Sequence, residues 1–64
     1  MNIYYNNQPM EVPEDVTIIE VISSVEEIEH KAVWLNGRHL MLEEFHKMLN
    51  PYDRIKVIRI RGGG

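Results

Sequence analysis

The chain contains no cysteine, no long hydrophobic run and no excess of positive charge. Without cysteine it can form no disulfide and offers no thiolate as a nucleophile or metal ligand. Its apolar stretches are far shorter than the roughly 20 residues that a membrane-spanning helix needs, and its first residues lack the basic and then apolar plan of a signal peptide. The net charge of −3 disfavours binding to a nucleic-acid backbone. We therefore expect a cytoplasmic protein that binds neither membrane nor nucleic acid.

The length of 64 residues predicts a single small domain. A domain of this size buries only about 60% of the surface of its unfolded chain, which leaves no room for both a core and a deep active-site cleft. The sequence offers no nucleophile–base pair and no glycine-rich phosphate loop, and His30, His39 and His46 fall on three separate predicted elements. We expect no metal site and no catalytic activity of the chain's own.

The first half of the chain predicts a hairpin followed by a helix. Residues 1–5 alternate as a strand, residues 6–9 are turn formers, and residues 10–12 return as a second strand. Thr17 and Glu20 have the spacing of a capping box, in which each side chain bonds the main chain at the other residue. A helix is expected over residues 18–27, with an apolar face made by Ile18, Val21, Ile22 and Val25.

The second half predicts three further strands. Residues 32–35 form one strand, and Asn36-Gly37 is a strong signal for a tight hairpin that returns over residues 38–41. A short helical turn within residues 43–49 would direct Phe45 and Leu49 inward.

The chain then turns over residues 50–53 and ends in a β-branched strand over residues 55–61. The order of elements indicates an α+β fold of the β-grasp, or ubiquitin-like, type, a mixed sheet of four to five strands with one main helix on one face. Residues 1–61 would form this domain and residues 62–64 a flexible glycine tail. In such a fold the first and last strands pair in parallel at the sheet centre.

The alternation of the last strand divides its residues between two faces. Ile55 and Val57 would enter the core, which leaves Ile58 and Ile60 on the face that no helix covers. Together with Tyr4 on the neighbouring strand, these side chains could form a docking patch for a partner. Alternatively, a bulge after Val57 would shift the register and bury Ile58.

The last three residues are all glycine. Glycine has no Cβ, so such a tail can enter a slot too narrow for other residues and adopt φ angles closed to them. Three residues span at most about 10 Å, which is enough to place a carboxylate in the active site of a partner. The alternative is an ordinary linker or frayed terminus.

The whole chain resembles the ThiS family, the small sulfur-carrier proteins of thiamin biosynthesis. The likeness runs from the first strand and turn through the capped helix and the third strand to the closing glycine pair. The segments that carry it are Met1-Asn2-Ile3-Tyr4-Tyr5-Asn6-Asn7-Gln8-Pro9-Met10, Thr17-Ile18-Ile19-Glu20-Val21-Ile22, Val33-Trp34-Leu35-Asn36, Glu44-Phe45, Asp53 and Gly63-Gly64.

The resemblance implies a carrier that acts as a protein co-substrate. Gly64 would be adenylated and then converted to a thiocarboxylate, Gly63 would be the slim approach residue, and Gly62 the joint. Arg59 and Arg61 would steer the tail toward an acidic groove of a partner, or would simply be two solvated charges.

The implied partners are an adenylating enzyme similar to ThiF, a thiazole synthase similar to ThiG, and a persulfide sulfur donor. No cofactor would be bound to the chain itself, and ATP would be consumed by the adenylating enzyme. Three alternatives stay open: a sulfur carrier for another pathway such as molybdopterin synthesis, a ubiquitin-like modifier, and a non-covalent binding module.

Overall fold

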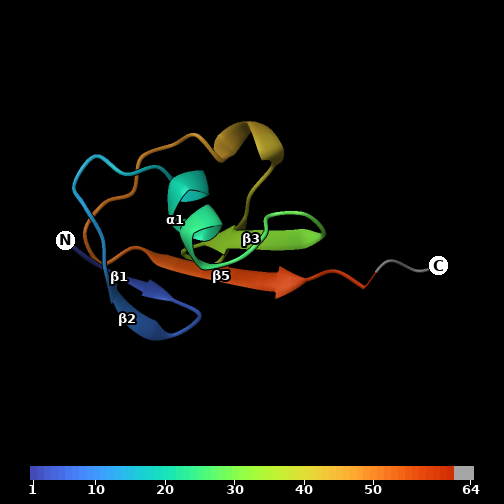
Figure 1. Ribbon diagram of the computed structural model, residues 1–64, viewed down its shortest axis with the longest axis horizontal. Coiled ribbons are helices and arrows are strands. Elements are labelled where there is room, and N and C mark those ends of the chain that lie inside the picture. Colours follow the sequence, from blue (N-terminus) through green and yellow to red (C-terminus); the bar gives the residue numbers. More distant parts are fainter. Residues whose placement is uncertain (62–64) are drawn as a thin grey trace.

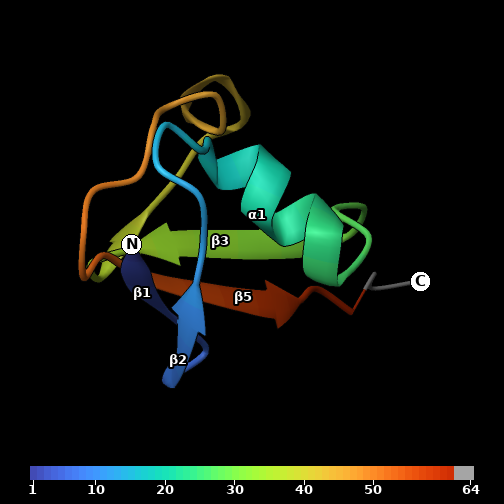
Figure 2. The ribbon, with the colours of Figure 1, turned by 60° about the vertical axis from the view of Figure 1, so that its left-hand side comes forward.

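The computed structural model describes residues 1–61, which fold into a five-stranded mixed sheet with one α-helix. The elements are β1 (Asn2–Tyr5), β2 (Gln8–Glu11), α1 (Ile18–Val25), β3 (Lys31–Leu35), β4 (Arg38–His39), a 3-10 helix (Leu42–Glu44) and β5 (Arg54–Arg59). The strand order is β2-β1-β5-β3-β4, and α1 lies over one face of the sheet (Figure 1, Figure 2). The predicted β-grasp fold is confirmed. Within the described residues, no helix is long and apolar enough to cross a membrane.

The first and last strands pair in parallel near the sheet centre, as predicted. The Tyr4 N–H donates to the Asp53 carbonyl at 2.9 Å, and the Asn6 N–H donates to the Ile55 carbonyl at 2.9 Å. On its other side β5 pairs antiparallel with the whole of β3, from Leu35↔Ile55 to Lys31↔Arg59. The strand that leads toward the C-terminus is thus anchored from two sides at its start (Figure 1).

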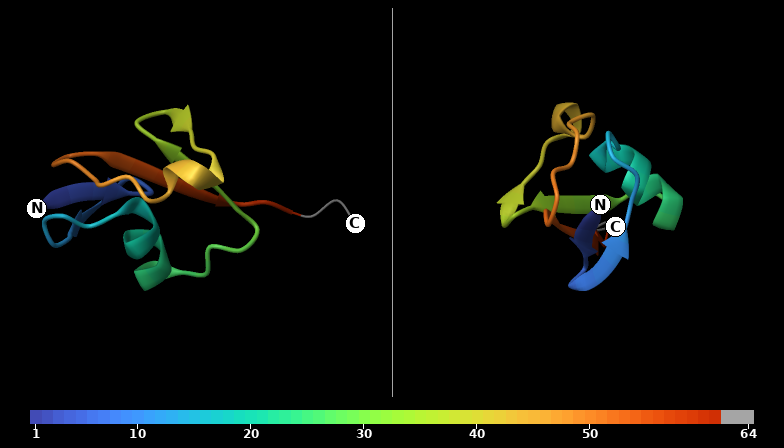
Figure 3. Two further views of the ribbon diagram at one scale, coloured as in Figure 1. Left: turned by 90° about the horizontal axis from the view of Figure 1, so that it is seen from above. Right: turned by 90° about the vertical axis from the view of Figure 1, so that its left-hand side faces the viewer.

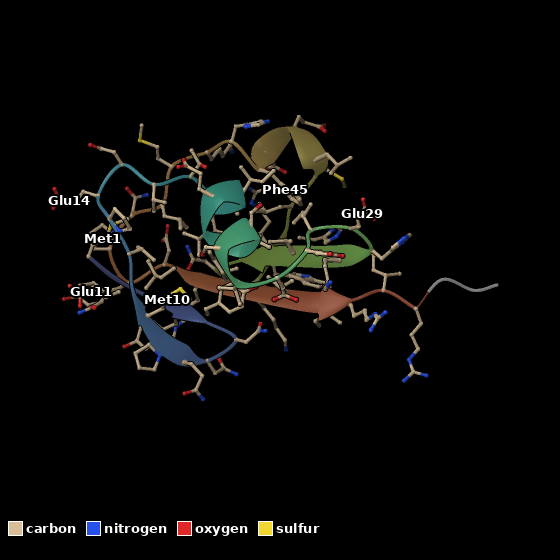
Figure 4. All side chains as sticks on the ribbon, viewed as in Figure 1. Met1, Met10, Glu11, Glu14, Glu29 and Phe45 are labelled. Atoms are coloured by element: carbon tan, nitrogen blue, oxygen red, sulfur yellow. The ribbon has the colours of Figure 1, made fainter. Side chains whose placement is uncertain are left out.

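The core lies between α1 and the covered face of the sheet. Its members come from every part of the chain, and Figure 4 shows Phe45 directed into the space beside α1. The buried apolar residues are Ile3, Tyr5, Val12, Val16, Ile18, Val21, Ile22, Val33, Leu40, Phe45, Leu49, Ile55 and Val57. The predicted inward positions of Phe45 and Leu49 are confirmed.

The helix begins as predicted but ends two residues early. Thr17 and Glu20 form the capping box, with the Glu20 N–H donating to Thr17 Oγ1 at 3.3 Å and the Thr17 N–H to Glu20 Oε1 at 3.2 Å. The helix stops at Val25 because Glu26 turns into extended backbone, where its carboxylate accepts the Tyr5 hydroxyl and lies 3.8 Å from Lys31 Nζ. Val25 is therefore exposed, and its predicted place on the packed helix face is wrong.

Both hairpins have two-residue turns with left-handed backbone. Asn6 and Asn7 have φ of 49° and 67°, and Asn36 and Gly37 have φ of 51° and 84°, angles that asparagine and glycine tolerate best. The first turn is shorter than predicted, so Pro9 lies within β2 instead of the turn. Proline is tolerated there because β2 is an edge strand.

The return strand of the second hairpin is also shorter than predicted. After Leu40 the chain leaves the sheet, because the Glu44 carboxylate accepts hydrogen bonds from the Met41 N–H at 3.1 Å and from the Arg38 guanidinium at 2.7 Å. The helical turn expected within residues 43–49 corresponds to the 3-10 helix Leu42–Glu44, which begins one residue earlier and ends well before Leu49.

The Glu44 carboxylate predicts a measurable pH dependence. The hydrogen bond from Arg38, followed by that from the Met41 N–H, lowers the pKa of Glu44 to about 2. Because the pKa is lower in the folded chain than the unfolded value of about 4.3, the ionised form stabilises the fold. This contribution is present above about pH 5 and is lost as the pH falls through the folded pKa. An NMR titration of the Glu44 carboxyl carbon should show a midpoint near pH 2, and Arg38→Gln should raise it. A midpoint at the ordinary glutamate value in the unmodified chain would contradict this assignment.

Candidate functional site

Burial along β5 alternates from Arg54 to Ile58, and the last residue of the strand, Arg59, is exposed as well. Ile55 and Val57 are buried, whereas Ile58 is 43% and Ile60 is 52% exposed. The pairing with β3 is one to one from Leu35↔Ile55 to Lys31↔Arg59, so no extra residue is inserted. The bulge that was the alternative to an exposed Ile58 is absent from this ladder, so that alternative is wrong.

The open face of the sheet presents apolar and aromatic side chains beside Ile58. Ala32 lies opposite Ile58 and Trp34 lies opposite Lys56 on the neighbouring strand. The Trp34 ring is also 5.0 Å, centre to centre, from the His39 ring. A hollow of about 400 Å³ opens on this side of the sheet, lined by Asn7, Trp34, Gly37, Arg54, Ile55, Lys56 and Ile58. A largely apolar surface with two cationic side chains therefore lies along β5.

Tyr4 lies farther from Ile58 than the sequence suggested. The parallel register pairs Tyr4 with Arg54, whose guanidinium carbon lies 4.5 Å from the centre of the Tyr4 ring. Ile58 comes four positions after Arg54 along β5, a distance of about 13 Å at the rise of a strand. The structure thus groups Ile58 with Trp34 and leaves Tyr4 at the other end of the open face. The register between β1 and β5 is set by main-chain hydrogen bonds, from the Tyr4 N–H to the Asp53 carbonyl and from the Asn6 N–H to the Ile55 carbonyl. No side-chain pattern in the sequence predicts this register.

Arg59 and Arg61 are exposed at the end of the described chain. They line a hollow of about 530 Å³ with His30 and Ile60. The left view of Figure 3 shows the chain beyond β5 leading away from the end of the molecule where the N-terminus lies. Within residues 1–61 neither arginine takes part in an ion pair. Both charges are available to a partner, and the steering role stays a prediction.

Asn6 holds the outer part of β5, which the sequence analysis did not foresee. Its Oδ1 accepts the Val57 N–H at 2.8 Å, and its Nδ2 donates to the Val57 carbonyl at 3.3 Å. The side chain therefore replaces a peptide group beyond the end of β1. From the sequence alone, Asn6 is predicted only as a turn former. Its amide carries one acceptor and donors together, which is the chemistry such a replacement requires.

The glycines predicted to carry the chemistry, Gly62, Gly63 and Gly64, lie outside the described residues. The described residues thus provide an anchored strand, an open apolar face and exposed arginines immediately before them.

Ile58 provides a test of the open face as a docking surface. Ile58→Asp places a charge on the exposed side of β5, so we expect partner affinity to fall by about tenfold or more while the free energy of unfolding changes by no more than about 0.5–1 kcal/mol. Titration calorimetry against the adenylating enzyme that the family resemblance implies measures the affinity, and urea denaturation measures the free energy of unfolding. Ile58→Val, which keeps the surface apolar, is the matched control. Global unfolding of the Asp variant would show that Ile58 supports the core instead.

Comparisons with known proteins place this geometry in a family. Neither a protein-family model nor a curated protein sequence matches the chain. Among solved structures, the crystal structure of the thiamine biosynthesis protein ThiS from Geobacter metallireducens is similar over 100% of this chain and 100% of that chain, with a TM-score of 0.83 and 30% sequence identity. The similarity therefore extends over the whole sheet and the helix, and 30% of the aligned residues are identical. The chain belongs to the ThiS family of thiamine biosynthesis proteins.

Proposed function

We propose that the chain is a cytoplasmic sulfur carrier that delivers sulfur for thiazole formation in thiamin biosynthesis. The observation that carries the proposal is the full-length similarity to a thiamine biosynthesis protein. The architecture supports it, because β5 leads from the sheet centre directly toward the terminal glycines. The thiamin pathway is preferred over molybdopterin synthesis because the similar structure is a thiamine biosynthesis protein.

The proposed chemistry takes place at the carboxylate of Gly64. A terminal carboxyl group has a pKa near 3.5 and is ionised at neutral pH, which makes its carbon a poor electrophile. Attack of a carboxylate oxygen on the α-phosphorus of ATP releases pyrophosphate and forms an acyl-adenylate. The terminal sulfur of a persulfide then attacks the acyl carbon and AMP leaves. A thiol finally cleaves the resulting S–S bond, which leaves the thiocarboxylate on Gly64 and a disulfide as the oxidised product.

The chain contributes presentation and docking to this sequence of reactions. The glycines Gly62 and Gly63 offer no side chain that would obstruct entry to a narrow active site. The open face with Ile58, and the charges of Arg59 and Arg61, would be recognised by the partners. The proposed partners are an adenylating enzyme of the ThiF kind, a thiazole synthase of the ThiG kind and a persulfide donor. The chain binds no cofactor, and the adenylating enzyme consumes the ATP.

The first step can be tested by exchange of labelled pyrophosphate into ATP. With the adenylating enzyme present, we expect exchange that depends on addition of this chain. The matched control is a synthetic chain whose Gly64 carboxylate is replaced by a carboxamide, which keeps the shape and removes the nucleophilic oxygen. Equal exchange with both chains, or none with either, would contradict the proposal. Transfer of the activated Gly64 to lysine amines in place of sulfur loading would indicate a modifier.

A further inference from the structure

One edge of β5 is covered over only the first part of the strand. β1 pairs with β5 at Arg54 and Ile55, whereas β3 accompanies β5 on the other edge as far as Arg59. Figure 1 shows β1 and β2 beside the beginning of β5, and β5 continuing past them toward the C-terminus. Beyond Ile55, β5 therefore pairs with another strand on one edge only.

The hydrogen bonds of neighbouring residues determine which groups face the uncovered edge. The Arg54 carbonyl accepts the Asn36 N–H at 2.8 Å, and the Ile60 N–H, just beyond β5, donates to the His30 carbonyl at 2.7 Å. The even-numbered positions of this segment therefore bond toward the side of β3. Main-chain groups alternate between the two edges along a strand. The N–H and C=O of residues 55, 57 and 59 therefore face the side of β1.

The Asn6 side chain marks the point where this edge becomes free. The Ile55 carbonyl bonds to the Asn6 N–H, and both main-chain groups of Val57 bond to the Asn6 amide. Next along the edge come the N–H and C=O of Arg59, which have no hydrogen-bond partner within residues 1–61. Unpaired groups on an edge held in strand conformation are a template for an added strand.

We propose that the Arg59 edge of β5 pairs with an extended segment of a partner enzyme that alternates acidic and apolar residues. The alternation follows from the two faces of β5. Ile58 is on the open face, which calls for an apolar residue beside it, and Arg59 is on the other face, which calls for a carboxylate. Cross-strand pairs of matching chemistry stabilise such an added strand.

A second copy of the chain is a poorer occupant of this edge. Antiparallel pairing of two copies about Arg59 would place their Arg59 side chains directly opposite each other, and like charges in that position are destabilising. Both Arg59 and Arg61 lack ion pairs within the described part of the chain. The charge of the edge therefore selects a partner of opposite sign.

The added strand also bears on how the tail is delivered. Pairing at Arg59 would fix β5 from both sides up to its last residue, which leaves only Ile60 and Arg61 before the glycines begin. Since it rests on the proposed function for the identity of its partners, the inference is tested with the adenylating enzyme and with the thiazole synthase.

The rate of amide hydrogen exchange at Arg59 shows whether its main-chain N–H is hydrogen-bonded. In the free chain, the Arg59 amide should exchange rapidly, whereas the Ile60 amide, which bonds to His30, should already be protected and serves as the internal control. Binding of either enzyme should slow exchange of the Arg59 amide by about tenfold or more. Exchange is quenched and then read by NMR of the 15N-labelled chain. Protection of Arg59 that appears in the free chain at rising concentration would indicate self-pairing and overturn the proposal.

A backbone substitution separates main-chain pairing from the arginine side chain. Chemical synthesis can replace the Arg59 N–H by an ester oxygen, which should weaken enzyme binding about tenfold and leave the unfolding temperature unchanged. The same replacement at Val57, whose N–H bonds to Asn6, should lower the unfolding temperature. If the Arg59 ester binds and is adenylated normally, edge pairing is wrong and the proposed function stands. If neither enzyme binds or processes the unmodified chain, both proposals are wrong.

Discussion

A chain that lacks Gly64 is expected to lose sulfur loading completely while unfolding at the same temperature as the intact chain. Loading requires a terminal carboxylate at the position where the adenylating enzyme holds its acyl carbon, and a displacement of one residue is about 3.5 Å along an extended chain. The sheet and the buried core that the structure describes end at or before Arg59, so deletion should leave them intact. Intact-mass measurement after incubation with ATP, adenylating enzyme and sulfur donor gives the first result, and thermal denaturation gives the second.

Addition of one alanine after Gly64 is the matched control for this deletion. It restores a carboxylate but displaces it outward by one residue, and it should also abolish loading. Full loading of either variant would mean that the position of the carboxylate does not matter, which the carrier function cannot accommodate.

Ile55→Ala is expected to destabilise the fold by about 2–5 kcal/mol, the usual loss for a large apolar side chain removed from a core. Ile55 is 2% exposed and lies on β5 where the strand is bonded on both sides. The loss is a large fraction of the 5–15 kcal/mol that typically stabilises a native domain. Urea denaturation followed by circular dichroism measures it.

Ile58→Ala provides the comparison on the same strand. The same atoms are removed from a side chain that is 43% exposed on the open face, so the change should be well under half of that for Ile55→Ala. Similar losses for the two variants would show that the two faces of β5 are not divided between core and surface as described.

Local patterns in the sequence predicted most of the fold. The capping box of Thr17 and Glu20, the Asn36-Gly37 turn and the alternation of β5 each follow from a few neighbouring residues, and all three are present in the structure. The parallel pairing of the first and last strands followed from the order of the elements and is also confirmed.

The errors arose where distant residues decide the local structure. The helix ends at Val25 because Glu26 bonds to Tyr5, which is 21 residues away in the chain. Tyr4 lies beside Arg54 because the register depends on main-chain bonds between β1 and β5.

In the candidate site, too, the features set by neighbouring residues could be predicted, whereas those set by distant residues could not. The exposure of Ile58 and Ile60 could be predicted from alternation, apart from the choice between a regular strand and a bulge. The hydrogen bonds between the Asn6 side chain and the Val57 main chain join residues 51 positions apart, so no short-range sequence pattern predicts them. The roles of Gly62, Gly63 and Gly64 come from the family resemblance and lie outside the described residues.

The intact mass of the chain after reaction tests the central claim most directly. The chain is incubated with ATP, the adenylating enzyme, a persulfide donor and a thiol, and its mass is compared with that of the chain incubated without ATP. For a sulfur carrier we expect an ATP-dependent gain equal to the replacement of one oxygen by sulfur, located by fragmentation at Gly64. An unchanged mass with an adenylating enzyme that is active on its own carrier, or sulfur located at any other residue, would contradict it.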